Sequence, residues 1–204
     1  MKKNSIFIVL LASTFFMQAQ TVLPSVKWNN PCTLEKALQS RSTTRSFSNK
    51  PIDSQTLSNL LWAANGVNRE DGRRTAPSAR NCQEIDIYLF TPENVQLYVP
   101  EDHSLKIVVE GDYRHKAAIQ PFAAKAPLLL VYVANYDKMG KMDKESQEFY
   151  GATDCGFVSQ NVYLFCAAEN LNTVVLGMIN REAIQELLQI NGKAILAQPI
   201  GYNK

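Results

Sequence analysis

The sequence predicts one α+β domain with a mixed, mainly antiparallel central sheet flanked by helices. Three features carry this prediction: helix-periodic apolar residues before position 66, strand-like runs that begin at Ile85, and a long helical segment over 146–168. The chain shows no internal repeat, no low-complexity linker and no regular β-α-β alternation. We therefore expect residues 20–204 to form a single compact unit.

The N-terminal segment has the pattern of a secretory signal peptide. Two lysines precede an apolar run over residues 6–16, which is too short to span a bilayer comfortably, and a small residue, Ala19, precedes a plausible cleavage site. We expect residues 1–19 to be removed and the protein to be exported, periplasmic or extracellular, without stable membrane insertion. An uncleaved N-terminal membrane anchor is the alternative.

Two helices are expected before the sheet. The first is capped by Thr33 and delivers the chain to Arg41, and the second is capped by Asp53 and stops near Gly66. Both carry apolar stripes at helical spacing: Leu34, Ala37 and Leu38 in the first, and Leu57, Leu60, Leu61 and Ala64 in the second. The mixed-charge stretch 69–74 is expected to be a solvated loop.

From Ile85 the apolar period changes to that of strands. Alternating and β-branched runs predict three strands separated by turns, at 85–90, 95–99 and 105–109. Asp112 starts a helix expected to run to Ala124, and the nearly unbroken apolar run 127–134 predicts a strand buried on both faces. Three more elements follow: a strand over 173–178, a helix over 181–189 and a strand over 194–201.

The long helix over 146–168 is apolar around much of its circumference, with Gly151, Ala152 and Gly156 near its start. A helix of this kind must be buried on several sides. In a domain this small, that favours a subunit interface in which the small residues allow close approach. A central core helix in a monomer is the alternative.

Charge and cysteine content narrow the function classes. The chain holds 21 basic and 19 acidic residues, and loss of the two leader lysines leaves 19 against 19, so no overall basic field attracts nucleic acid. No CxxC motif occurs, and His103 and His115 stand apart from other ligands, so we expect no metal site and an exposed His103. Cys32 and Cys82 are the one pair considered for a disulfide, because the other two cysteines lie about three turns apart on one helix.

Two segments carry the candidate chemistry. Residues 41–47, Arg-Ser-Thr-Thr-Arg-Ser-Phe, combine two guanidinium groups with several hydroxyls, a set that suits a phosphate-bearing cofactor. Residues 76–83, Ala-Pro-Ser-Ala-Arg-Asn-Cys-Gln, place a turn-forming Pro-Ser beside two amides that can address a flat heteroaromatic ligand. Each segment alone is more often a solvated loop, but their pairing ahead of the strands favours a cofactor site. No GxGxxG follows a first strand, so a Rossmann dinucleotide site is unsupported.

With these segments the chain resembles the nitroreductase superfamily of FMN-dependent oxidoreductases. Two further pieces carry the likeness: the helix 154–168 leading into 171–177, and the closing Pro-Ile-Gly-Tyr at 199–202. The pieces occur in the family's order and span nearly the whole mature chain. Within the superfamily, 97–105 and 110–114 look most like the branch that holds the peptide azoline dehydrogenases.

The resemblance implies an intertwined homodimer with two FMN sites at the interface. Arg41 and Thr43 would hold the phosphate and ribityl chain, and Arg45 would lie beside the pyrimidine edge of the ring. The loop 77–81 would approach the ring from the other subunit, and Gly177 would direct its N–H at flavin N5. The implied cofactor-binding residues are Arg41, Ser42, Thr43, Arg45, Pro77, Ser78, Ala79, Asn81, Gln120, Leu176, Gly177 and Lys204.

The implied activity is two-electron hydride transfer by a ping-pong mechanism on a nitroaromatic, quinone or heterocyclic substrate, with NAD(P)H as a candidate donor. Because FMN carries the hard step, no catalytic side chain is assigned. The alternative is an exported, non-catalytic protein that binds flavin or a small aromatic ligand, since Glu84-Ile85 stands where the family often has Pro-Trp. A structural dimer with an empty groove is a third hypothesis.

Overall fold

The computed structural model describes residues 20–28 and 32–204, so the signal-peptide prediction for residues 1–19 lies outside the described residues. A seven-stranded sheet forms the centre, in the order β1-β4-β3-β2-β5-β7-β6, and every pairing between these strands is antiparallel. The strands are β1 (Gln20–Val22), β2 (Ile85–Phe90), β3 (Asn94–Val99), β4 (Ser104–Glu110), β5 (Leu128–Asn135), β6 (Leu171–Thr173) and β7 (Gly192–Tyr202). The predicted α+β class, with a mainly antiparallel sheet flanked by helices, is confirmed.

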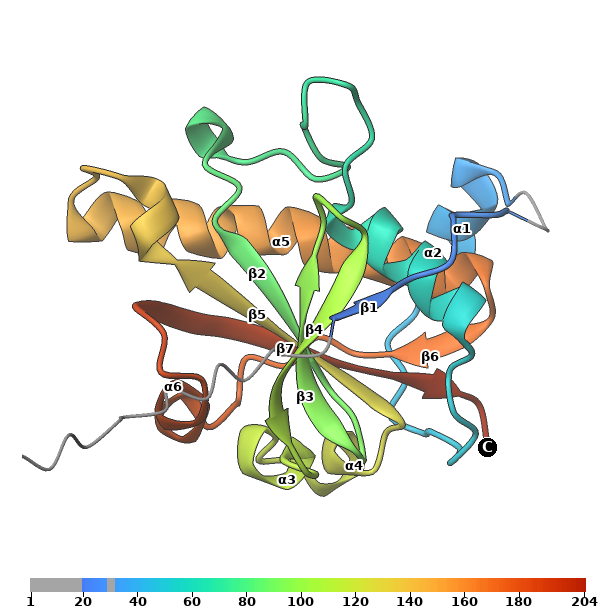
Figure 1. Ribbon diagram of the computed structural model, residues 1–204. Helices are drawn as coiled ribbons and strands as arrows, with labels where there is room; N and C mark the ends of the chain where they lie inside the picture. The colour runs from blue at the N-terminus through green and yellow to red at the C-terminus, as the bar shows by residue number, and fades with distance from the viewer. Residues whose placement is uncertain (1–19, 29–31) are drawn as a thin grey trace, which may run out of the picture.

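Helices cover both faces of the sheet (Figure 1). The helices are α1 (Leu34–Ser40), α2 (Ser54–Asn65), α3 (Arg114–Ala117), α4 (Pro121–Ala124), α5 (Lys144–Ala168) and α6 (Arg181–Leu188), with short 3-10 turns η1 (Ala79–Asn81) and η2 (Tyr136–Met139). The long α5 lies with α1 and α2 over one face, and α3, α4 and α6 lie over the other (Figure 1). No helix of the described residues is long and apolar enough to cross a bilayer.

The strand β5 divides the core into two layers because successive side chains of a strand point to opposite faces. Leu130 and Tyr132 pack with α2 and α5 in one cluster, whereas Leu129 and Val131 pack with α6 in the other. All four side chains are fully buried. The unbroken apolar run predicted this two-sided burial, and the prediction is confirmed.

Two predicted elements differ from the structure. The single helix expected from Asp112 to Ala124 is instead two separate turns, α3 and α4, because Pro121 disfavours helical geometry at the preceding residue, and Gln120 is extended with φ −86° and ψ 122°. The strand expected over 173–178 ends at Thr173 as β6, and beyond it Leu176 alone bridges to β7. The edge strand β1 was not expected from the sequence.

The prediction that His103 is exposed is wrong. Its ring is half-buried, with Nε2 at 2.7 Å from the Ser58 hydroxyl and Nδ1 at 2.9 Å from the Tyr98 hydroxyl. Its carbonyl accepts the Leu23 N–H at 3.0 Å, so the residue fastens the segment after β1 to the sheet. Burial lowers the pKa of His103.

All four cysteines are free, so Cys32 and Cys82 do not form the disulfide that was considered.

Candidate functional site

The segment 41–45 leaves α1 and runs beside β6. Arg41 caps α1, its N–H bonded to the Ala37 carbonyl at 2.9 Å. Further along, the Thr44 N–H donates to the Thr173 carbonyl at 3.0 Å, and the Thr173 N–H donates to the Thr44 hydroxyl at 3.1 Å. These backbone bonds fix the path of the segment, so its two arginines emerge from defined positions.

Tyr163 of α5 contacts two residues of the segment 41–45. Its hydroxyl lies 3.0 Å from the Thr43 hydroxyl and accepts the Val175 N–H at 2.9 Å, while the Arg41 guanidinium carbon lies 5.3 Å from the ring centroid. One side chain thus joins the arginine segment to the stretch that leads to Gly177. Sequence reasoning missed Tyr163, because a tyrosine on an apolar helix gives no signal that separates it from a core residue.

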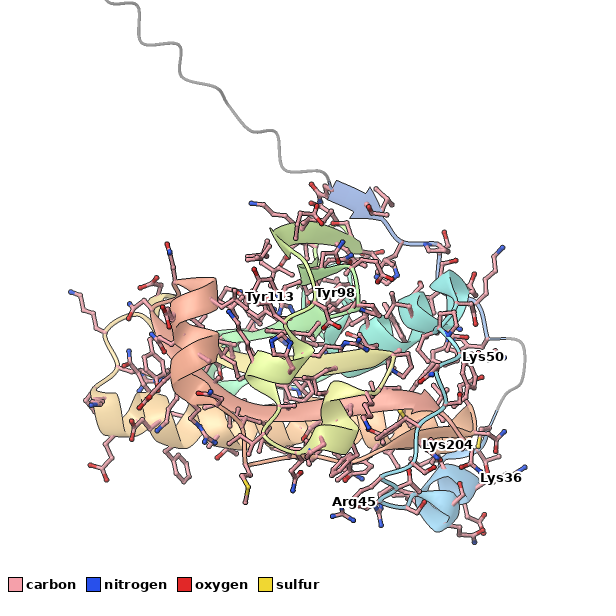
Figure 2. The ribbon with its side chains drawn as sticks, turned by 90° about the horizontal axis from the view of Figure 1, so that it is seen from below. Lys36, Arg45, Lys50, Tyr98, Tyr113 and Lys204 are labelled. Atoms are coloured by element: carbon pink, nitrogen blue, oxygen red, sulfur yellow. The ribbon has the colours of Figure 1, made fainter. Side chains whose placement is uncertain are left out.

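A cavity of about 200 Å³ lies at the end of the segment and is lined by three cations and two aromatic rings: Arg45, Lys125, Lys204, Phe47 and Phe122. The two phenylalanine rings are stacked, with centroids 6.4 Å apart and planes 21° apart. Figure 2 shows the side chains of Arg45 and Lys204 at the same edge of the molecule. No carboxylate of the described residues forms an ion pair with any of the three cations.

This cavity offers unneutralised positive charge beside flat apolar surface, which fits a ligand that is both anionic and aromatic. The structure places Arg45 and Lys204 on one cavity and adds Lys125, which sequence reasoning missed. Gln120 belongs to the same α4 region, and its side-chain oxygen is buried with no hydrogen-bond partner among the described residues. Gln120 does not line the cation-rich cavity itself.

The other predicted residues of the segment lie elsewhere. Ser42 lines a separate, more polar cavity of about 310 Å³ with Tyr163, Asn172 and Asn203. Arg41 stacks on the Tyr163 ring and does not line the cation-rich cavity. Residues of the arginine segment therefore line two separate cavities, Ser42 the more polar one and Arg45 the cation-rich one.

The stretch after β6 presents the Leu176–Gly177 pair. Leu176 exchanges two backbone hydrogen bonds with Ala197 of β7, at 2.7 and 3.0 Å. These bonds fix the position of the adjacent Gly177 relative to β7. The Gly177 carbonyl accepts a bond from Arg181 at 3.0 Å, whereas its N–H has no partner among the described residues. An exposed N–H at a fixed position can donate to a ligand.

The loop Pro77–Gln83 has an unusual backbone. Arg80, Asn81 and Gln83 all adopt left-handed conformations, with φ of 53°, 55° and 52°. The loop is braced by the Ser78 hydroxyl, which accepts the Gln83 N–H at 2.9 Å. Left-handed non-glycine residues cost free energy and persist where the surroundings hold them, often at functional sites.

Within one chain the two predicted halves of the site remain apart. The Ala79 N–H donates to Asp154 of α5 at 2.7 Å, whereas Thr43 contacts Tyr163 of the same helix. Those two helix positions are ~13 Å apart along the axis at ~1.5 Å per residue. Pro77 and Asn81 are exposed and do not line the cavity that contains Arg45.

Metal chemistry finds no support in the described residues, which contain no cluster of His, Cys, Asp and Glu able to hold a metal ion. Another hollow, of about 730 Å³, is lined by residues of the β2–β3 turn, the segment 49–52 and Lys125. It is mainly apolar and shares Lys125 with the cation-rich cavity.

Comparison with known proteins shows which proteins this chain is similar to. A Methanocaldococcus jannaschii protein, provisionally named a nitroreductase, is 33% identical over 178 residues, which cover 82% of this chain and 90% of the relative. The crystal structure of a provisionally named nitroreductase from Ralstonia eutropha JMP134 has a TM-score of 0.85 at 37% identity, covering 91% of this chain and 90% of that one. A chain of the E. coli microcin synthetase McbBCD complex shares the fold alone, with a TM-score of 0.69 at 17% identity over 99% of this chain and 85% of that one.

The family model described as the nitroreductase family matches residues 38–202, a span that includes the arginine segment, the left-handed loop, α5 and β7. The chain therefore belongs to the nitroreductase family and is a flavin-dependent oxidoreductase.

Proposed function

We propose that the protein binds FMN between two copies of the chain and uses it for two-electron transfer to or from a nitroaromatic, quinone or heterocyclic substrate. The observation that carries the proposal is the cavity in which Arg45, Lys125 and Lys204 surround the stacked Phe47 and Phe122. When bound, FMN would supply hydride transfer at its ring, and NAD(P)H is the candidate donor.

The residues of this chain would bind and orient the cofactor. The fixed cations would neutralise the phosphate and the negative charge that develops on the pyrimidine side of the ring. The Gly177 N–H, the Gln120 oxygen and the left-handed loop would supply directional polar contacts. We assign no side chain as an essential acid or base, because FMN would carry the hydride transfer.

A second copy of the chain is needed because the left-handed loop and the arginine segment are separated within one chain. The outer face of α5 supports such pairing: Phe149 is 64% exposed and Phe157 is 45% exposed, although both are large apolar side chains. Between them Gly156 has no atom within 4 Å of a built Cβ position, so the face is open to close approach. Packing two α5 helices along this face would bury the aromatics and bring each loop towards the partner's arginines.

The test is an Arg45→Ala/Lys204→Ala double variant, with Lys36→Ala as the matched control. Lys36 is an exposed cation on α1 at the same edge of the molecule but outside the cavity (Figure 2). We expect the folded double variant to lose FMN while the control retains it, because only the double variant removes charge that faces the ligand. Equal retention of FMN by both variants would refute the site.

Reduction kinetics separate an enzyme from a carrier. Anaerobic bleaching of the bound flavin by NADH or NADPH, followed by reoxidation with a quinone or nitroaromatic, would support turnover. A flavin that only dithionite reduces would favour the alternative of a non-catalytic flavin-binding protein on the same fold.

We also propose that the protein is exported after cleavage behind Ala19, as the leader pattern indicates. Gln20, the residue that would follow the cleavage site, lies in β1, and its side-chain amide donates to the Ser104 hydroxyl at 2.6 Å. N-terminal sequencing of the protein purified from its native host would show Gln20 as the first residue. An intact leader there would exclude cleavage.

A further inference from the structure

Two carboxyl groups lie together in the core beneath the left-handed loop. Glu84 is fully buried, and neither of its side-chain oxygens has a hydrogen-bond partner among the described residues. Asp154 of α5 is 3% exposed and lies within hydrogen-bonding reach of Glu84. Ionised carboxylates only accept hydrogen bonds, so a bond between these two groups requires a proton on one of them.

Electrostatics favour that shared proton. Burial, followed by the hydrogen bond and the charge of Asp154, raises the pKa of Glu84 to about 7 from an ordinary value of 4.5. The backbone N–H of Glu84 itself and, more weakly, the charge of Lys138 in η2 oppose this rise. Burial and then the charge of Glu84 raise the pKa of two nearby thiols, Cys155 of α5 and Cys82 of the loop. Two adjacent buried carboxylates would repel each other with little solvent screening, as in other carboxylate pairs.

The pair is connected to the candidate site through Asp154. Its Oδ2 atom accepts the Ala79 N–H at 2.7 Å, which places the backbone immediately before the left-handed residues. The strained loop conformation depends on such external bonds, since Arg80 and Asn81 would not adopt it by themselves. A change of charge on Asp154 or Glu84 would therefore act on the exposed Pro77–Asn81 surface.

We propose that Glu84 and Asp154 share one proton and act as positioning residues that hold the Pro77–Gln83 loop in the conformation that receives flavin. This inference rests on the proposed function, because it assigns the loop to the flavin site. Loss of the shared proton would leave two facing carboxylates that repel each other. The repulsion would displace Asp154 from the Ala79 N–H, and the loop would then bind flavin less tightly.

The test is the pH dependence of FMN affinity, measured by quenching of flavin fluorescence between pH 6.5 and 8.5. Wild-type protein is compared with Glu84→Gln, whose amide donates to Asp154 at every pH and cannot titrate. The FMN phosphate has its second ionisation near pH ~6, but that change affects both proteins equally and cancels in the ratio of their dissociation constants. We expect the wild-type constant to rise at least about threefold relative to Glu84→Gln across this range.

The matched control is Asp143→Asn, which removes a carboxylate that caps the same helix far from the loop and keeps the capping ability. Its pH profile should follow the wild type. A wild-type profile parallel to that of Glu84→Gln would overturn the inference. If wild-type protein binds no FMN at pH 6.5, the proposed function fails, and this is distinguishable from a pH-independent affinity, which refutes only the shared proton.

An infrared measurement keeps the inference testable if Glu84→Gln does not fold. Wild-type protein should show the absorption of a protonated carboxyl group at pH 6.5 that disappears by pH 8.5. A spectrum without a protonated carboxyl group over this whole range would contradict the shared proton, independently of flavin.

Discussion

Removal of a single hydroxyl, in Tyr163→Phe, tests how the arginine segment is held. The substitution keeps the ring, and with it the stacking of the Arg41 guanidinium at 5.3 Å from the centroid. It removes two hydrogen bonds: the Val175 N–H loses its acceptor at 2.9 Å, and the Thr43 hydroxyl loses its partner at 3.0 Å. The variant therefore isolates hydrogen bonding from packing.

The expected magnitude follows from those two bonds. Each intramolecular hydrogen bond contributes a net ~0.5–1.5 kcal/mol, so the two together give a loss of about 1–3 kcal/mol in the free energy of unfolding. The half-buried Val175 N–H contributes most of this loss, because it is left without an acceptor, whereas the exposed Thr43 hydroxyl can bond to water.

Urea unfolding measures the change, with Tyr150→Phe as the control. Tyr150 is on the same helix, and its hydroxyl forms no hydrogen bond with the described residues, so its removal should cost less than about 0.5 kcal/mol. FMN affinity should also fall about fivefold or more in Tyr163→Phe, because the arginine segment loses its anchor. A free-energy loss no larger than that of the control would refute the role assigned to Tyr163.

Three further predictions concern stability. Gly201→Ala should destabilise by about 1–3 kcal/mol in urea unfolding, because the added Cβ would lie 2.8 Å from Pro127 Cδ in a rigid ring; a neutral result would show that the ring moves freely. Tyr132→Phe should lower the free energy of unfolding by about 1–3 kcal/mol, because the buried Gln198 side-chain oxygen loses the hydrogen bond that the Tyr132 hydroxyl donates at 2.6 Å. Adding Gln198→Leu should recover part of this loss; no recovery would contradict the role assigned to the bond. The pKa of His103 in the folded state is lower than its usual 6.5, so the stabilising contribution of the neutral ring is fully present above that pH and is lost as the pH falls. The free energy of unfolding of His103→Gln should therefore decline less than that of the wild type between pH 7.5 and 5.5.

Sequence reasoning reaches those parts of the fold that local physics determines. The two-sided burial of β5 follows from its unbroken apolar run, and the starts of α1 and α2 follow from the capping residues Thr33 and Asp53, whose side chains accept backbone N–H groups as expected. The break at Pro121 also has a local cause, which the apolar pattern around it obscures. The β1 edge and the His103 anchor depend on contacts between segments far apart in the chain, which no local pattern encodes.

The candidate site divides in the same way. The motif predicts Arg45 and Lys204, and the structure places both on one cavity. The third cation, Lys125, comes from a surface turn that carries no motif, and the Glu84–Asp154 pair is created when the start of β2 packs against the middle of α5. Because each of these residues acquires its role through tertiary contacts, sequence spacing alone could not identify it.

The central claim is that cations of this chain hold a flavin phosphate and ring between two copies of the chain. Calorimetric titration of flavin-free protein with FMN, combined with the molar mass in solution, tests it most directly. The account predicts a dimer that binds one FMN per chain. A monomer, or a dimer that releases no heat on titration and retains no flavin after excess FMN is removed, would contradict it.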